Sequence, residues 1–146
     1  MKILVINGPN LNLLGIREPD IYGKQDYNTL VQLIRDTCQS EGITVEIMQS
    51  NHEGVIIDAI QEARLSQDGI IINAGAYTHT SLAIHDALKA VGLPVVEVHI
   101  SDISRREQFR RFSYPGLVAI KGFVGLGLDG YRQAILCLKA HLEQTQ

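Results

Sequence analysis

Arg17 and Tyr22 lie five positions apart in the polar segment 8–23 and together could abstract a proton. A free phenol titrates near ~10 and is a poor base at neutral pH, but a cation within a few ångströms lowers an acid's pKa by ~1–3 units. Arginine supplies that cation because it stays charged even when it is buried. The pair therefore predicts that Tyr22 is a general base and that Arg17 activates it.

His99, on a distant segment, could provide the complementary acid. Imidazole titrates near ~6.5 and can donate a proton to a leaving group at neutral pH. A base and an acid on separate segments suit an elimination of water. Proton removal beside a ketone forms an enolate, which the side chain of Asn10 could stabilise, directly or through a water.

Three further segments could bind an anion. The segment 73–81 is rich in small and hydroxyl residues, and its amides could hold a carboxylate. Ser101 and the amide before it are a second candidate, and Arg110 could bind a hydroxyl or an acid. These residues alone predict cofactor-free acid/base catalysis on a small, anionic, oxygen-rich molecule.

Each of these signals also has a purely structural explanation. A single histidine, such as His79 or His99, is more often a hydrogen-bonded structural residue. The hydroxyls of residues 78, 80 and 81 could cap a helix, and the arginines at 105, 106, 110 and 111 could form a solvated face that pairs with Glu107. Joint placement at one crevice favours the functional interpretation, because chance would scatter these residues.

Short apolar runs alternate with segments of helical periodicity, a pattern typical of a parallel sheet covered by helices. The expected strands are 2–7, 44–49, 69–73, 95–99 and 119–124, and the expected helices are 28–40, 54–65, 81–91 and 131–143. Right-handed crossovers then favour a flavodoxin-like α/β fold, a three-layer sandwich with strand order 2-1-3-4-5, in a single catalytic domain over residues 1–146. Ligands of such sheets bind beyond the carboxyl ends of the strands, where the polar segments begin.

Two patterns that resemble cofactor sites are better explained otherwise. The segment 125–130 matches G-x-G-x-x-G, but the 16 residues after it leave no room for the acidic residue that a dinucleotide site needs about 20 positions on. It is predicted to be a tight strand-to-helix turn. His79 and His85 lack the i, i+4 spacing of a helical metal site, so neither a metal nor an organic cofactor is expected.

Composition limits the partners. The chain has 146 residues, 45% of them hydrophobic, and a formal charge of −3, which argues against general nucleic-acid binding. Its apolar runs are too short to span a membrane. No signal peptide is recognisable, so a cytoplasmic location is expected, with Cys38 and Cys137 as reduced thiols.

Several long motifs in the same order resemble type II 3-dehydroquinate dehydratase. They are NGPNLNLLG at 7–15, REP at 17–19, YG at 22–23, QSNHEG at 49–54, NAGAYTHTS at 73–81, EVHIS at 97–101 and FR at 109–110. The resemblance covers nearly the whole chain. It implies an anti elimination of water from 3-dehydroquinate, through an enolate, to give 3-dehydroshikimate, without metal or organic cofactor. Both shikimate biosynthesis and quinate catabolism use this reaction, and the sequence does not choose between them.

The same resemblance implies individual roles. It assigns Tyr22 as base, Arg17 as its activator, His99 as acid and Asn10 to the enolate. The implied substrate-binding residues are Asn73, His79, Ile100, Ser101 and Arg110. Asp86 matches a position that reaches a neighbouring subunit's site, in a homododecamer built from trimers.

Mild departures from the family pattern at 102–106 and at Pro115 leave open whether Arg105 or Arg106 contributes to the site. The alternative function is a flavodoxin-like module that binds an anion or signals without turnover.

Overall fold

A computed structural model describes residues 1–16 and 25–146 of the chain. Five strands form one sheet of order β2-β1-β3-β4-β5, in which all neighbours are parallel. They are β1 (Lys2–Asn7), β2 (Thr44–Gln49), β3 (Gly69–Asn73), β4 (Val95–His99) and β5 (Lys121–Val124). The predicted fold and strand order are confirmed. Four strands have their predicted bounds, and β5 begins two residues later than expected, because the amides of Val118 and Ala119 still donate to Pro115 in the preceding turn.

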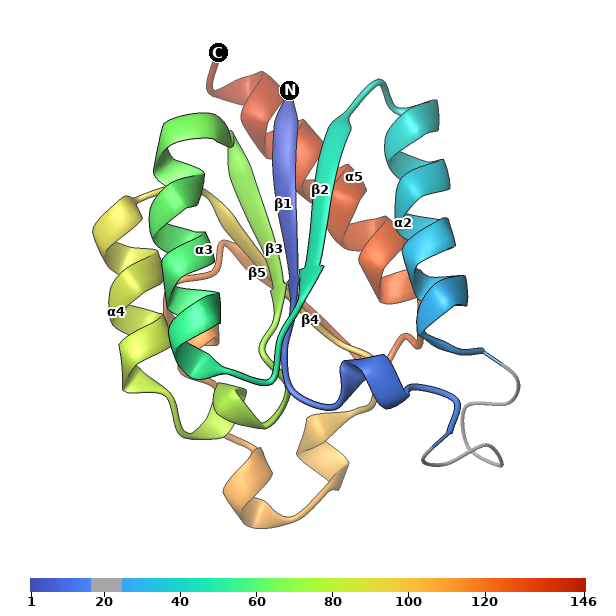
Figure 1. Cartoon of the computed structure of the whole chain (residues 1–146), viewed down its shortest axis with the longest axis vertical. Coiled ribbons are helices and arrows are strands. Elements are labelled where there is room, and N and C mark those ends of the chain that lie inside the picture. The colour runs from blue at the N-terminus through green and yellow to red at the C-terminus, as the bar shows by residue number, and fades with distance from the viewer. Residues whose placement is uncertain (17–24) are drawn as a thin grey trace.

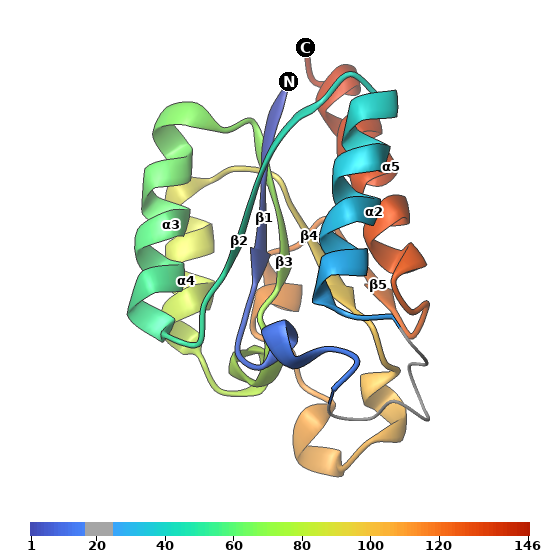
Figure 2. The same ribbon diagram turned by 45° about the vertical axis from the view of Figure 1, so that its right-hand side comes forward.

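Helices cover both faces of the sheet, as Figure 1 shows. On one face lie α3 (Glu53–Ser66) and α4 (Leu82–Val91), and on the other lie α2 (Tyr27–Ser40) and α5 (Asp129–Gln144). The three layers are also distinct in the view turned by 45° (Figure 2). The predicted helix bounds are correct to within two residues. The ends are set by local chemistry, since the Asp26 and Ser81 side chains cap α2 and α4 by accepting amide N–H groups.

Each face of the sheet has its own apolar core, and every residue of the inner strands β3 and β4 is buried. The helical period predicts that Leu30, Val31, Ile34 and Cys38 form the apolar stripe of α2; Leu30, Ile34 and Cys38 are buried, and Val31 is half-buried. Cys38 and Cys137 are both free thiols, and burial raises the pKa of the Cys38 thiol to about 11. None of the helices in the described part of the chain is long and apolar enough to cross a membrane.

The carboxyl ends of β1, β3 and β4 lead into short 3-10 turns at the lower edge of the molecule, opposite the two termini (Figure 1). These are η1 (Leu11–Leu13), η2 (Gly75–His79), η3 (Ile103–Arg105) and η4 (Gln108–Arg110), and a further turn, η5 (Pro115–Leu117), comes before the amino end of β5. The turn η1 was not expected; it forms because the amides of Leu13 and Leu14 donate to carbonyls three residues earlier. The glycine-rich segment is confirmed as a strand-to-helix turn, with positive φ at Gly125 and Gly127 between β5 and α5.

Candidate active site

The described residues form a cavity of about 210 Å³ beyond the carboxyl ends of β1, β3 and β4, where the topology places ligand sites. Seven of the ten predicted site residues line it. They are Asn10, Asn73, His79, His99, Ile100, Ser101 and Arg110. Residues separated by as many as 100 positions in the sequence therefore meet around a space suited to a small molecule.

Three predicted residues remain, and of these Asp86 is described and does not line the cavity. Asp86 lies on α4, and its carboxylate is exposed and within 2.9 Å of His85 Nδ1. Arg17 and Tyr22, the predicted activator and base, lie outside the described residues. The described part of the chain holds no cluster of three or more residues that could bind a metal ion.

The loops after β1 and β3 pack tightly together at the rim. A side chain at Gly8 would place its Cβ only 2.4 Å from the carbonyl oxygen of Ala74. Asn10 has φ 69°, a left-handed conformation that asparagine tolerates better than most residues. The backbone N–H of Asn10 donates to Asn51 Oδ1 at 3.1 Å, and Gln49 Nε2 donates to the same oxygen. These contacts hold the backbone of Asn10 at the edge of the cavity.

His99 is buried beside a buried carboxylate. Its Nε2 lies 3.0 Å from Oε2 of Glu97, two residues earlier on β4, so both side chains project from the same face of the strand. The ring is not aligned for a hydrogen bond, and Nε2 has no hydrogen-bond partner among the described residues. Ser113 donates its hydroxyl to the same Glu97 oxygen. At this distance the carboxylate interacts with the ring electrostatically, and it can favour a protonated imidazole that has a proton to donate.

The other polar residues have defined partners as well. Nδ1 of His79 donates to the carbonyl oxygen of Phe112 at 2.7 Å, which leaves Nε2 for a ligand. Arg110 donates through Nε to Glu107 at 2.8 Å and also lines the cavity. Arg110 therefore makes the pairing with Glu107 that was predicted for one of the arginines, and it also lies at the cavity, where its role in binding stays a prediction.

The structure distinguishes the two arginines that the sequence left open. Arg106 lines the cavity. The Arg105 side chain is 87% exposed, and its Nε lies 3.4 Å from the carboxylate of Asp102. Arg105 therefore forms an ion pair at the surface, outside the cavity. Arg106 is thus the one in a position to contact a ligand.

Sequence reasoning missed the roles of Glu97 and Ser113. The i, i+2 spacing of Glu97 and His99 on a predicted strand was a usable signal, because it places both side chains on one face. No sequence signal pointed to Ser113, which reaches Glu97 from the segment between η4 and η5.

The sequence of the chain is similar to that of a known protein family. A family model described as class II dehydroquinase matches residues 1–139. The chain belongs to the class II dehydroquinase family. Among the relatives of this family, the 3-dehydroquinate dehydratase of Clostridium acetobutylicum is 52% identical over 144 residues, covering 99% of this chain and 100% of the relative. That of Lachnoclostridium phytofermentans is 57% identical over 136 residues, covering 92% and 94%.

Solved structures agree with this membership of the dehydroquinase family. The type II dehydroquinase from Butyrivibrio crossotus has a TM-score of 0.92 and 56% identity, covering 95% of this chain and 97% of that one. At this TM-score the two chains share the same fold.

Proposed function

We propose that this chain dehydrates 3-dehydroquinate to 3-dehydroshikimate by an anti elimination that passes through an enolate. The observation that supports it most is the His99 and Glu97 pair, buried at a polar cavity in a chain about half identical to 3-dehydroquinate dehydratases over nearly its full length. Such a pair suits a histidine that must deliver a proton at a fixed position. The family model covers residues 1–139, which supports one catalytic domain over the chain.

In the proposed reaction, Tyr22 removes the proton beside the ketone and Arg17 keeps the phenol ionised. Asn10, held at the cavity edge by Asn51, stabilises the enolate. His99 then protonates the departing hydroxyl. The Glu97 carboxylate favours the protonated ring that delivers this proton.

The remaining residues around the cavity bind the substrate. Asn73, His79 and Arg110 offer side-chain donors, and Ile100 and Ser101 offer backbone and hydroxyl groups at the end of β4. Arg106 adds a second guanidinium, which favours a carboxylate-bearing substrate. The reaction uses only these protein groups, with no metal or organic cofactor.

We also propose that copies of the chain assemble as a homododecamer built from trimers, in the cytoplasm. Asp86 then reaches the cavity of a neighbouring subunit; its exposed position on α4, outside the lining of its own cavity, supports this. Large apolar side chains exposed nearby, on Leu82 of α4 and Leu117 of η5, suit a subunit interface. The two free thiols fit a reducing compartment.

The test is turnover of 3-dehydroquinate by the purified chain, followed by the ultraviolet absorbance of the conjugated enone product. We expect a colourless protein whose rate is unchanged by a metal chelator. Loss of the rate in chelator would contradict the proposed mechanism. Binding of 3-dehydroquinate without product would instead favour the alternative, an anion-binding or signalling module.

A further inference from the structure

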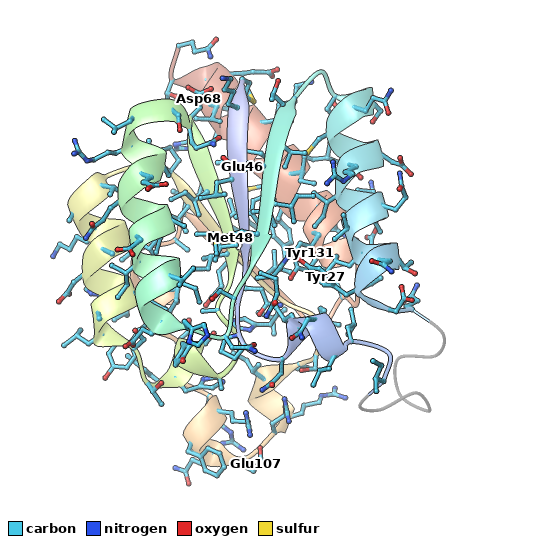
Figure 3. All side chains as sticks on the ribbon, viewed as in Figure 1. Tyr27, Glu46, Met48, Asp68, Glu107 and Tyr131 are labelled. Atoms are coloured by element: carbon cyan, nitrogen blue, oxygen red, sulfur yellow. The ribbon has the colours of Figure 1, made fainter. Side chains whose placement is uncertain are left out.

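Three buried polar side chains are linked behind the cavity, on the side of the sheet covered by α2 and α5. The hydroxyl of Tyr131, in the first turn of α5, donates to Asn7 Oδ1 at 2.7 Å. Asn73 Nδ2 donates to the same hydroxyl at 3.0 Å. Tyr131 and Asn7 are fully buried, and Asn73 is 4% exposed. Figure 3 labels Tyr131 on this side of the sheet, toward the ends of the strands where the cavity lies.

Packing alone does not account for this phenol. The rest of the buried face of α5 is apolar or small, including Ala134, Ile135 and Leu138, and a phenylalanine ring would fill the same space. A buried hydroxyl is costly unless it is hydrogen-bonded, and here both of its partners are also buried. The two partners, Asn7 and Asn73, are paired residues at the last positions of β1 and β3. The hydroxyl thus ties together the ends of the two strands between which ligands bind in this fold.

The contacts also fix which way the Asn73 amide faces. The Gly75 amide donates to Asn73 Oδ1 at 3.2 Å, so the oxygen end of the side chain is held by a donor. At the other end Tyr131 accepts from Nδ2, and its own hydrogen is directed to Asn7. If the Asn73 side-chain amide were reversed, its NH2 group would face the N–H of Gly75, and two donors would meet. Its oxygen would face the Tyr131 hydroxyl, whose hydrogen is already donated to Asn7. Burial raises the pKa of the Tyr131 hydroxyl, so it stays neutral and keeps this arrangement.

We infer that Tyr131 is a positioning residue of the active site. Its hydroxyl sets the orientation of the Asn73 amide, which then presents one N–H and one lone pair to the substrate in a single arrangement. Tyr131 is not among the residues that line the cavity, so it acts through Asn73. This inference rests on the proposed function, in which Asn73 binds 3-dehydroquinate.

The test compares three variants in steady-state kinetics with 3-dehydroquinate. Tyr131→Phe keeps the ring and removes only the hydroxyl; we expect KM to rise about tenfold and kcat to stay within about threefold, because a binding contact is misaligned. Asn73→Ala should raise KM at least as much. In the double variant Tyr131→Phe/Asn73→Ala, KM should equal that of Asn73→Ala alone, because the hydroxyl then has no amide left to orient.

A purely structural role gives a different pattern. It would lower the thermal unfolding temperature of Tyr131→Phe and leave KM of the folded protein unchanged, and that unchanged KM would overturn the inference. A KM in the double variant equal to the product of the two single-variant increases would overturn it as well. Tyr27→Phe is the matched control. The Tyr27 hydroxyl accepts from Asn7 Nδ2 at 3.4 Å and makes no hydrogen bond to Asn73 among the described residues, so KM of this variant should stay within about twofold of the parental value. If Tyr131→Phe fails to fold, Asn7→Leu tests the same arrangement. Without Asn7 the Tyr131 hydroxyl hydrogen can turn to Asn73, so the Asn73 amide is no longer held in one orientation and KM should rise as well. Lack of turnover by the unmodified chain would refute the proposed function, whereas a normal KM in these variants beside an active parent refutes only the inference.

Discussion

Replacing Glu97 with glutamine removes one charge from the buried pair and nearly preserves its shape. The carboxylate lies 3.0 Å from His99 Nε2, and both side chains are buried, so water screens the interaction poorly. With an effective dielectric constant of ~20, the carboxylate and a protonated His99 ring at that separation would interact by about 5 kcal/mol, which is a ceiling on how far Glu97 favours the protonated ring that delivers the proton. If glutamine loses about half of this stabilisation, kcat falls by roughly 30- to 300-fold, at 1.36 kcal/mol per decade.

The assay is the steady-state formation of the enone product by Glu97→Gln. We expect KM to change by less than about threefold, because Glu97 is not among the cavity-lining residues. The matched control is Glu143→Gln on α5, which removes a charge from an exposed pair with Lys139 at 3.8 Å and should leave kcat unchanged. A parental kcat in folded Glu97→Gln would refute the reasoning that this carboxylate supports the acid.

Three further predictions test other parts of the account. His99→Ala should lower kcat by about 100-fold or more with the circular dichroism spectrum unchanged, and a loss of less than about tenfold would remove His99 from the role of acid. Asp86→Ala should weaken substrate binding only in the assembled oligomer, as measured by calorimetry beside light scattering; unchanged affinity would argue against a site shared between subunits. Iodoacetamide at pH 8 should modify Cys137 before Cys38, because burial raises the pKa of Cys38 to about 11 and keeps it as a thiol, and equal rates by mass spectrometry would contradict this.

The fold was predictable from the sequence because period and composition agree over each element. Ile70, Ile71 and Ile72 are apolar without alternation, which is typical of a strand covered on both faces, and they are fully buried. Leu30, Ile34 and Cys38 repeat every four residues and face the core as expected. The start of β5 was misplaced by two residues, because the hydrogen bonds of a 3-10 turn before it leave no period in the sequence, and α5 begins two residues earlier than predicted.

The meeting of seven candidate residues at one cavity was predictable, and their contacts were less so. The rule that ligands bind at the carboxyl ends of parallel strands brought residues such as Asn10, His79 and His99 to one cavity. The sequence could not show whether Arg105 or Arg106 faces the cavity, because the backbone path of the short turn η3 decides which of these neighbours points inward. It also could not show that Asn7 meets Tyr131, since 124 residues separate them and only the packing of α5 on the sheet joins them.

The central claim is that a tyrosine phenolate removes the proton. The most direct measurement compares kcat of Tyr22→Phe with that of the unmodified chain on 3-dehydroquinate, with folding verified by thermal unfolding. A loss of about 100- to 10,000-fold is predicted, since phenylalanine cannot accept a proton. A folded Tyr22→Phe protein that forms 3-dehydroshikimate at the parental rate would contradict the claim.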